Sequence, residues 1–403
     1  ERIHLEDDAP FDQYSTLQSD ENEAGSVVLD SSFFVAGDNV IAVEIHQLSG
    51  SSSDISFDLE LRGQPAGGGG MHSSSPLALT ESGWLYSRSY NPGTGEWSAL
   101  NVAHYNVETE PADATNLVIS EFSYRPAEPS AANEVAVSTD RDDYEFIELL
   151  NIGSKTIDLS GVGFANGISF SFAENSLLGI GKRVVLVSNA AAFSERYSAV
   201  EIGGIFSSGN LSNGSEQVVL SSVTSGVIRE FTYEDVAPWP SAGDGAGYSL
   251  VLIAPVTNPD HNDPLNWRSS VDIHGSPGGT DAISYAVWKS ANGITDDFGD
   301  PDGDGLSNLG EFASGSDFQV SGSEGELTGQ VVDGFFEVEI QRNLRAADEF
   351  DLIVESSLDL VNWSNDGIYV GETNLGNGTA SVEYRVEMNA NPKRFVRARW
   401  VLR

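Results

Sequence analysis

The stretch 144-YEFIELLNIGSKTIDLSGVGF-164 decides the fold of the largest region of the chain. Its first part, 144-YEFIELLN-151, combines aromatic and aliphatic residues in a run of strand length and therefore predicts a β-strand. A polar turn follows, and the tetrapeptide 158-DLSG-161 marks a corner before the next strand. Short strands that end in tight polar turns are typical of β-sandwiches.

Segments of this kind recur along the chain, and turns rich in Gly, Ser and Asn separate them at intervals of about eight to twelve residues. Helical pattern is confined to 282-AISYAVWKSAN-292 and 306-LSNLGEFAS-314. The sequence therefore predicts a mainly β protein, built of tandem β-sandwich modules with a short helical connector. The other predicted strands are 39-NVIAVEIHQ-47, 55-ISFDLELR-62, 183-RVVLVSN-189, 216-EQVVLSS-222, 335-FFEVEIQ-341 and 394-RFVRARWVL-402.

Charge is the most unusual property of the composition. The 403 residues include 61 acidic and 20 basic ones, which gives a formal net charge of −41. A field of this sign repels nucleic acids and anionic membranes, and it attracts divalent cations. No run of 18 apolar residues occurs, so the sequence predicts no membrane-spanning helix.

The chain has no cysteine, so disulfide bonds and thiol chemistry are excluded. An extracellular or cell-surface location, with calcium in place of disulfides, fits this composition, although a cytosolic protein could also lack cysteine. Because the chain begins at Glu1 without Met or a signal peptide, we expect a processed or excised part of a longer protein.

Flexible or polar linkers divide the chain into modules of roughly the expected domain size. These linkers are 64-QPAGGGG-70, 108-ETEPADAT-115, 275-GSPGGTD-281 and 319-QVSGSEGE-326. They separate a β piece at 1–63, a small β unit at 71–107, a sandwich at 116–281, a helix–loop–helix connector at 282–318 and a last β-sandwich module at 327–403.

The region 116–281 resembles the lamin tail domain, an immunoglobulin-like sandwich found in nuclear lamins and in many secreted bacterial proteins. Besides 144–164, the resemblance rests on 117-LVISEFSYRP-126, 179-GIGKRVVLVSN-189, 210-NLSNGSEQVVLSS-222 and 228-IREFTYEDVAPWP-240. The insertion 128-EPSAANEVAVSTDRDD-143 departs from the simplest form of the family, and we expect it to form a long acidic loop.

Other segments resemble modules of the same kind of bacterial protein. Residues 36–63 are similar to the closing strands of a galactose-binding-like jelly roll, which makes 1–63 the C-terminal part of such a module. Residues 77–105 resemble a small β unit attached to chitobiase-type enzymes, and 285–318 resembles a calcium-binding connector. The resemblance implies a CotH-like kinase domain or a hydrolase upstream in the parent protein.

The stretch 300-DPDGDGLSNLGE-311 has the spacing of a twelve-residue calcium loop, of the EF-hand or thrombospondin type 3 kind. Gly305 stands where such a loop turns sharply. The alternative is an acidic, solvated turn. The expected Ca²⁺ ligands are the side chains of Asp300, Asp302, Asp304 and Glu311, the carbonyl of Leu306, and Asn308 directly or through water.

Further candidate sites rest on composition and position alone. Asp296 and Asp297 lie just upstream of the loop and could complete the calcium shell or hold a second ion. The inserted loop offers Asp140, Asp142 and Asp143 as additional calcium ligands, with a hydrated loop as the alternative. Candidate glycan contacts are the tryptophans near turns, whose indoles could stack on a sugar ring: Trp84, Trp97, Trp239 and Trp363.

Motifs of catalysis are absent from the sequence. It contains neither HExxH nor G-x-S-x-G, and the expected metal ligands fill the coordination sphere without leaving a position for substrate. We therefore expect a non-catalytic structural or adhesive segment of a secreted or cell-surface protein, with calcium and another surface protein or an extracellular polysaccharide as partners, and with self-assembly open. The alternative function is that of accessory glycan-binding modules of a polysaccharide-degrading enzyme or a CotH-like kinase protein.

Overall fold

The computed structural model describes residues 83–403, except 92, 106, 323–326 and 389–392. The predicted strands at 39–47 and 55–62, and with them the expected jelly-roll piece at 1–63, lie outside the described residues. All described residues belong to the unit Leu79–Arg403. Strands dominate it, and the prediction of a mainly β fold is confirmed.

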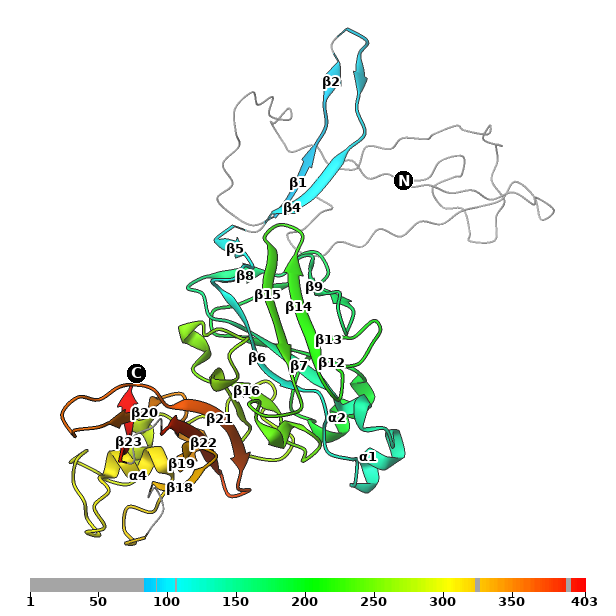
Figure 1. Cartoon of the computed structure of the whole chain (residues 1–403). Helices are drawn as coiled ribbons and strands as arrows, with labels where there is room; N and C mark the ends of the chain where they lie inside the picture. The colour runs from blue at the N-terminus through cyan, green and yellow to red at the C-terminus, as the bar shows by residue number, and fades with distance from the viewer. Residues whose placement is uncertain (1–82, 92, 106, 323–326, 389–392) are drawn as a thin grey trace. The chain divides into compact units, whose positions relative to one another are not determined.

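An antiparallel hairpin lies in the predicted small β unit (Figure 1). Strand β1 (Gly83–Ser87) pairs with β4 (Asn101–Tyr105), and the short strands β2 (Tyr90–Asn91) and β3 (Glu96–Trp97) continue the hairpin toward its tip. At the tip, Gly95 adopts a φ of +75°, a left-handed conformation that favours glycine.

Residues 109–281, here called the central sandwich, contain a six-stranded sheet in the order β13–β12–β7–β6–β16–β17. Every neighbouring pair in this sheet is antiparallel except β12 and β13. The strands are β6 (Leu117–Ser123), β7 (Phe146–Asn151), β12 (Arg183–Val187), β13 (Ile202–Ile205), β16 (Leu250–Leu252) and β17 (Trp267–Ser269).

Two smaller sheets complete the central sandwich. The four-stranded sheet has the order β10–β9–β14–β15, and the three-stranded sheet has the order β11–β8–β5. Their strands are β9 (Val162–Phe164), β10 (Phe170–Ser171), β14 (Glu216–Ser222), β15 (Gly226–Tyr233), β5 (Thr109–Pro111), β8 (Thr156–Asp158) and β11 (Leu177–Leu178).

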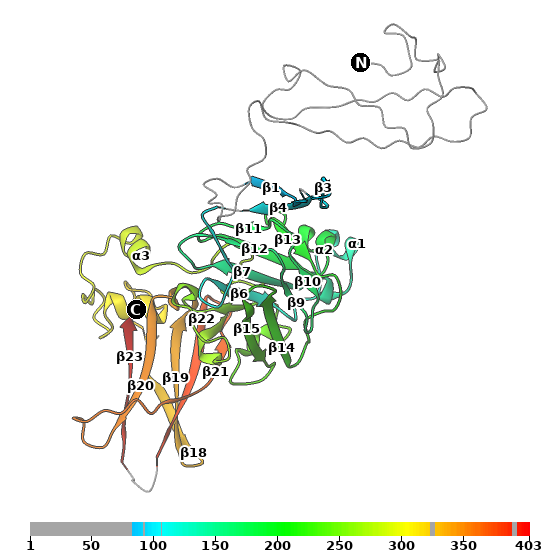
Figure 2. The same cartoon turned by 90° about the horizontal axis from the view of Figure 1, so that it is seen from above.

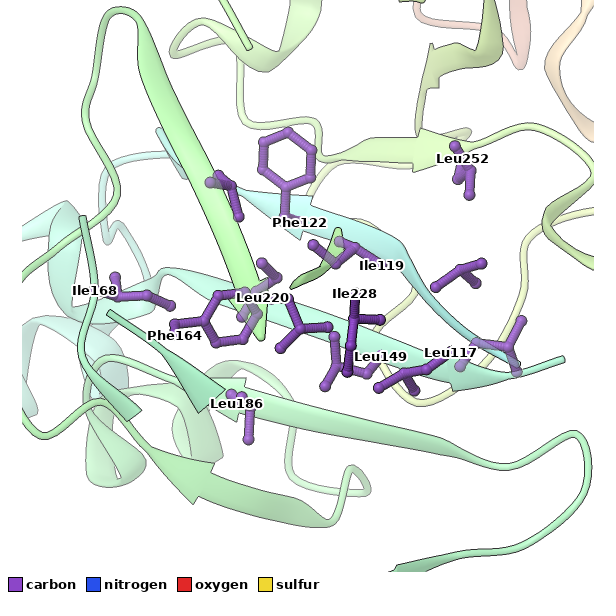
Figure 3. Close-up of a cluster of buried hydrophobic side chains, with 14 of the residues drawn as sticks. Leu117, Ile119, Phe122, Leu149, Phe164, Ile168, Leu186, Leu220, Ile228 and Leu252 are labelled. Carbon is purple, nitrogen blue, oxygen red and sulfur yellow. The ribbon is translucent and has the colours of Figure 1, made fainter. Parts of the chain in front are cut away.

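The core of the central sandwich lies between the sheets (Figure 3). Ile119 and Phe122 of β6 and Leu149 of β7 meet Leu220 of β14 and Ile228 of β15, and all are at most 3% exposed. Burying side chains of this size stabilises the fold by about 1.5–3 kcal/mol each. Apolar burial on facing sheets therefore explains why these segments form one sandwich.

The insertion at 128–143 is not simply an acidic loop, and that expectation was wrong. It contains helix α1 (Ala132–Val137) and the start of the 3₁₀ turn η2 (Arg141–Tyr144), while helix α2 (Ala190–Arg196) packs nearby. The buried Glu134 carboxylate accepts a hydrogen bond from Nε of Arg196 at 2.7 Å, and its backbone carbonyl accepts one from the Tyr144 hydroxyl at 2.9 Å. These bonds order the insertion against α2.

Residues 328–403, the C-terminal sandwich, form a four-stranded sheet in the order β18–β19–β22–β21 and a two-stranded sheet of β20 and β23. Val338, Val354 and Val382 are at most 1% exposed in its core. Its strands are β18 (Thr328–Val332), β19 (Phe335–Asn343), β20 (Phe350–Ser357), β21 (Ile368–Asn374), β22 (Thr379–Glu387) and β23 (Phe395–Leu402).

Helices α3 (Tyr285–Ala291) and α4 (Asn308–Ser314) lie in the connector between the sandwiches, close to the two predicted helical segments. Each helix has a serine N-cap, since Ser284 Oγ accepts from the Val287 backbone and Ser307 Oγ from the Gly310 backbone, both at 3.3 Å. The α4 helix ends at Gly315, whose φ of +81° is a left-handed C-cap.

Candidate metal centre

The loop between α3 and α4 winds tightly around its own carboxylates. Backbone N–H groups of Gly303 and Gly305 donate to the two oxygens of Asp300, at 2.8 and 3.0 Å, and the Leu306 N–H donates to Asp304 Oδ1 at 2.8 Å. Gly303 and Gly305 have φ values of +77° and +98°, which other residues rarely adopt. The glycines therefore allow the turns that bring the aspartates together.

Asp300, Asp302 and Asp304 form a cluster in which one carboxylate oxygen from each lies within 4.8 Å of the others. No other group of three or more His, Cys, Asp or Glu side chains in the described part of the chain meets this criterion. At such separations, like charges repel by about 1–4 kcal/mol per pair. The cluster by itself is therefore unfavourable.

Glu311 of α4, a predicted ligand, is not part of this 4.8 Å cluster, but it lies close enough for the charges of the three aspartates to act on it. The residue is 0% exposed, and neither of its carboxylate oxygens has a hydrogen-bond partner in the described structure. Desolvation, followed by the charges of Asp302, Asp304 and Asp300, raises the pKa of Glu311 to about 7. Burying a carboxylate is costly unless a hydrogen-bond donor or a cation compensates it. The described part of the protein supplies no donor to the Glu311 carboxylate.

Two neighbouring oxygens share this condition. Asp302 Oδ2 and Asn308 Oδ1 are also buried without a hydrogen-bond partner, and desolvation together with Asp304 and Asp300 raises the pKa of Asp302. The amide nitrogen of Asn308 donates to the Asp296 carbonyl at 2.9 Å, which fixes the orientation of the side chain. Unpaired acceptors of this kind are the ligands that Ca²⁺ and Mg²⁺ take in proteins.

Asp296 and Asp297 have other partners. Asp297 is ion-paired with Lys289 of α3 and accepts a hydrogen bond from the Tyr285 hydroxyl at 3.0 Å; the bond to Lys289 is the main reason why its pKa is lowered. Asp296 Oδ1 accepts from the Phe298 N–H at 3.0 Å. Asp297 thus links the loop to α3, and Asp296 positions Asn308 through its carbonyl.

Asp140, Asp142 and Asp143 do not form a carboxylate cluster. Asp140 and Asp142 line a polar cavity of about 540 Å³ together with Arg125 and Arg141, whose positive charges disfavour a cation. Asp140 Oδ1 caps η2 by accepting from the Asp142 N–H at 3.1 Å. Their placement favours a local structural role.

The four tryptophans that sequence placed near turns differ in exposure. Trp84 and Trp97 are 57% and 53% exposed on the hairpin, and the Arg88 guanidinium lies 4.3 Å from the ring centre of Trp97. Trp363 is half-buried beneath Arg397, whose guanidinium lies 4.0 Å from its ring centre.

The expectation that Trp239 is an exposed glycan contact was wrong. Trp239 is only 4% exposed and packs against Phe231 and Trp267, with ring centres 6.4 and 6.0 Å away. Within the turn that carries it, the Trp239 backbone N–H donates to the Val236 carbonyl at 3.1 Å, and the side chain belongs to the core of the central sandwich. A position next to a turn therefore did not imply exposure.

Sequence reasoning missed a buried pair of glutamates, Glu121 of β6 and Glu148 of β7, which lie opposite each other in the sheet. They are 2% and 1% exposed. Desolvation and the charge of Glu148 raise the pKa of Glu121 to about 8, and desolvation also raises the pKa of Glu148. Their only sequence signal was an acidic residue inside each of two mainly apolar strands.

This pair holds the segment 275–281, here called the strap, across the six-stranded sheet. Ser276 N–H donates to Glu121 Oε1 at 2.8 Å, and Gly278 N–H donates to Glu148 Oε2 at 2.6 Å. Arg183 Nε also donates to Glu148, at 3.0 Å. Each carboxylate is buried and bonded within the protein, so the pair does not face a cleft as a glycosidase pair must.

A family model of the lamin tail domain matches residues 110–235, which is less than half of the chain. No curated protein and no solved structure matches the chain. No helix in the described part combines the length and apolar character needed to cross a membrane. The matched residues coincide with the main strands of the central sandwich, from β5 to β15. Residues 110–235 are therefore similar to the lamin tail domain, an Ig-like β-sandwich of a non-catalytic structural family.

Proposed function

We propose that the chain is a non-catalytic structural or adhesive segment of a secreted or cell-surface multidomain protein, and that Ca²⁺ bound at 300–311 stabilises it. The observation that carries the proposal is Glu311, which buries two unpaired carboxylate oxygens beside three clustered aspartates. A cation of charge two relieves both the repulsion and the desolvation.

The donor set fits calcium. The four carboxylates of Asp300, Asp302, Asp304 and Glu311 would ligate the ion together with the Leu306 carbonyl and the unpaired Asn308 Oδ1. Ca²⁺ accepts six to eight oxygen ligands at about 2.3–2.6 Å, whereas Mg²⁺ requires a stricter octahedron and keeps several waters. The bound ion would neutralise the carboxylates and tie the loop to α4.

Packing of α4 explains how this tie would stabilise the protein. Phe312 of α4 lies 5.1 Å from the Trp288 ring of α3 and 6.0 Å from the Phe350 ring of the C-terminal sandwich. The Phe312 carbonyl also accepts from Asn343 Nδ2 at 2.9 Å. An ion that fixes Glu311 therefore braces one end of the C-terminal sandwich.

The two sandwiches are joined by buried polar contacts as well. Glu372 of β21 is ion-paired with Arg342 and accepts from the Ser269 N–H of the central sandwich at 2.8 Å. Asn374 Nδ2 donates to the Ser270 carbonyl at 3.0 Å. A rigid junction of this kind suits a role in spacing or holding neighbouring domains.

Location and parent protein follow from the same proposal. An acidic, cysteine-free chain with a calcium loop suits a calcium-rich, extracellular or cell-surface setting. The parent would be a bacterial protein in which a galactose-binding-like module includes 1–63, with a CotH-like kinase domain or a hydrolase upstream.

Isothermal titration calorimetry of the full chain with CaCl₂ and with MgCl₂ tests the proposal. We expect one Ca²⁺ site, with weaker Mg²⁺ binding, and we expect Glu311→Gln to weaken Ca²⁺ binding by at least about tenfold because one ligand charge is lost. Asp140→Asn is the matched control and should leave the affinity unchanged. Absence of calcium binding to the folded wild-type chain would refute the proposal.

A second candidate function, accessory glycan binding, is favoured by the hairpin. Trp84, Tyr86 and Trp97 are each more than half exposed there. Exposed planar rings suit stacking on sugars. A glycan array probed with the full chain and with Trp97→Ala would test it, since specific binding should weaken in the variant.

A further inference from the structure

Strand β23 is an edge strand whose outer side has no backbone partner among the residues that the structure describes. It pairs along its whole length with β20 alone. The far side of β20, by contrast, is partly covered, because Ser356 and Ser364 exchange two backbone hydrogen bonds of 2.9 Å there. Figure 2 shows β23 at one margin of the C-terminal sandwich. An open edge of this length is a template for another strand.

Alternation along the ladder identifies the open groups. The Arg403 N–H donates to the Glu349 carbonyl at 2.9 Å, in register with the β20–β23 pairing. In an antiparallel pair, only every second residue bonds its partner strand in this way. The N–H and C=O groups of the even-numbered residues therefore point away from β20. These residues are Val396, Ala398, Trp400 and Leu402.

Side chains of β23 are also incompletely covered. Val396 and Trp400 pack against the core of the C-terminal sandwich, but both remain only partly buried. On the opposite face, the side chains of Arg397 and Arg399 are 40% and 44% exposed. A strand added beside β23 would cover Val396 and Trp400 with the side chains of one face. Its other face would lie beside Arg397 and Arg399.

Charge distinguishes this edge from the rest of the chain. The stretch 393-KRFVRARWVLR-403 contains five of the 20 basic residues and no acidic one. Arg397 and Arg399 both donate through Nε to Glu355 Oε2 at 2.8 Å, so two guanidiniums share one carboxylate and leave a local positive charge. At physiological ionic strength, charges more than about 8 Å away are largely screened. Arg394 and Arg403 are each paired with one carboxylate, Asp366 and Asp351, so the excess positive charge at this edge comes from Arg397 and Arg399.

We propose that the free edge of β23 binds an extended acidic segment of another protein by β-strand addition. The segment would alternate apolar and acidic residues. Its apolar side chains would cover Val396 and Trp400, and its carboxylates would face Arg397 and Arg399. A second copy of β23 fits poorly, because pairing would bring arginine rows together and like charges across strands are destabilising.

The test uses the full chain and three labelled peptides: acidic SEVEVEVS, basic SKVKVKVS, and acidic SEVPVEVS, whose proline blocks strand pairing. Fluorescence anisotropy should show binding of the first peptide only, weakening as salt rises. Residue-resolved amide exchange should show that the N–H groups of Val396, Ala398, Trp400 and Leu402 exchange more slowly in the complex.

Variants distinguish the contribution of the arginine side chains to peptide binding from that of the backbone edge. Arg397→Glu combined with Arg399→Glu should weaken binding of the acidic peptide on the order of tenfold and favour the basic one. Arg345→Glu is the matched control, since this exposed arginine of the same module lies outside β23. Ala398→Pro should abolish binding while retaining the β20 ladder, because the lost N–H points outward. If the Ala398→Pro variant does not fold, the binding measured for the arginine variants still tests the proposal.

Three outcomes would overturn the proposal. The first is that the folded chain binds none of the peptides, and the second is that it binds the acidic and basic peptides equally well. Binding of the acidic peptide without slower exchange of the four edge amides would show that the arginines alone form the site. Polygalacturonate, an anionic polysaccharide that cannot add a β-strand, is the control. We expect it to leave the exchange of these four amides unchanged.

Discussion

Glu372 of the C-terminal sandwich accepts a hydrogen bond from the backbone N–H of Ser269, at the edge of the six-stranded sheet, over 2.8 Å. Glu372 is 4% exposed, and its second oxygen is ion-paired with the buried Arg342. A single carboxylate thus satisfies a strand edge in one sandwich and a guanidinium in the other. This contact predicts that the two sandwiches unfold together.

Glu372→Ala should lower the free energy of unfolding by about 3–5 kcal/mol, because it leaves the Arg342 charge buried without a partner. Urea denaturation followed by circular dichroism measures this. The paired replacement Arg342→Met and Glu372→Leu should recover much of the loss, since it removes both charges. Equal losses in the single and paired variants would contradict this explanation.

Glu145 should make stability depend on pH. It is 0% exposed, and desolvation raises its pKa to about 9 from an ordinary value of 4.5. The folded state therefore favours the protonated form, so the contribution of Glu145 is full below about pH 4.5 and is lost as pH rises toward 9. Glu145→Gln should flatten the fall in stability between pH 5 and 9 by up to about 1.4 kcal/mol per pH unit.

Urea denaturation at several pH values compares wild type with Glu145→Gln. Glu96→Gln, at an exposed position of the hairpin, is the control. Parallel curves for wild type and Glu145→Gln would show that Glu145 does not titrate in this way.

Trp239→Ala should destabilise the central sandwich by about 3–5 kcal/mol, because it removes a ring packed against Phe231 and Trp267. Trp97→Ala, at an exposed site, should change stability by only about 0.5 kcal/mol. Thermal unfolding of both variants checks the contrast. Similar melting temperatures would mean that Trp239 is not a core residue.

Gly305→Ala should weaken calcium binding, because a residue with Cβ strains at the φ of +98° that the loop requires. A penalty of about 1–2 kcal/mol corresponds to roughly a five- to thirtyfold loss of affinity. Gly293→Ala, at a φ of +67° outside the loop, is the matched control. Calorimetry should show a change only for Gly305→Ala, although both variants lose stability.

Removal of calcium should loosen the connector before it affects the central sandwich. Without the ion, Glu311 and the three aspartates would repel one another, and α4 would lose its anchor. Amide exchange in the presence of EGTA should rise in 299–316, while β6 and β7 stay protected. An unchanged exchange pattern with and without EGTA would contradict a structural role for the ion.

Local patterns in the sequence were sufficient for several strands of the described residues and for the clustering of three aspartates. The runs at 144–151 and 216–222 correspond closely to β7 and β14, because apolar residues and tight turns leave few alternatives. The spacing of 300–311 likewise gathered its aspartates, since glycines at fixed positions dictate the turn.

Contacts between distant segments could not be predicted in the same way. Glu134 meets Arg196 and Glu372 meets Ser269 across 62 and 103 residues, and the sequence carries no local signal for either pair. Exposure was equally hidden, because Trp97 and Trp239 both lie beside turns but only the second one covers a core. Such outcomes depend on tertiary packing, which overrides local pattern.

The strap at 275–281 shows that the end of the family match and the end of the folded unit are different positions in the chain. Family resemblance ends at residue 235, yet Glu121 and Glu148, well inside that limit, have bonds to Ser276 and Gly278 beyond it. A fragment trimmed at the edge of resemblance would also lack β16 and β17, and β6 would become an unprotected margin. The cooperative folding unit is therefore larger than the region of homology, and an expression boundary placed at residue 235 would cut through it.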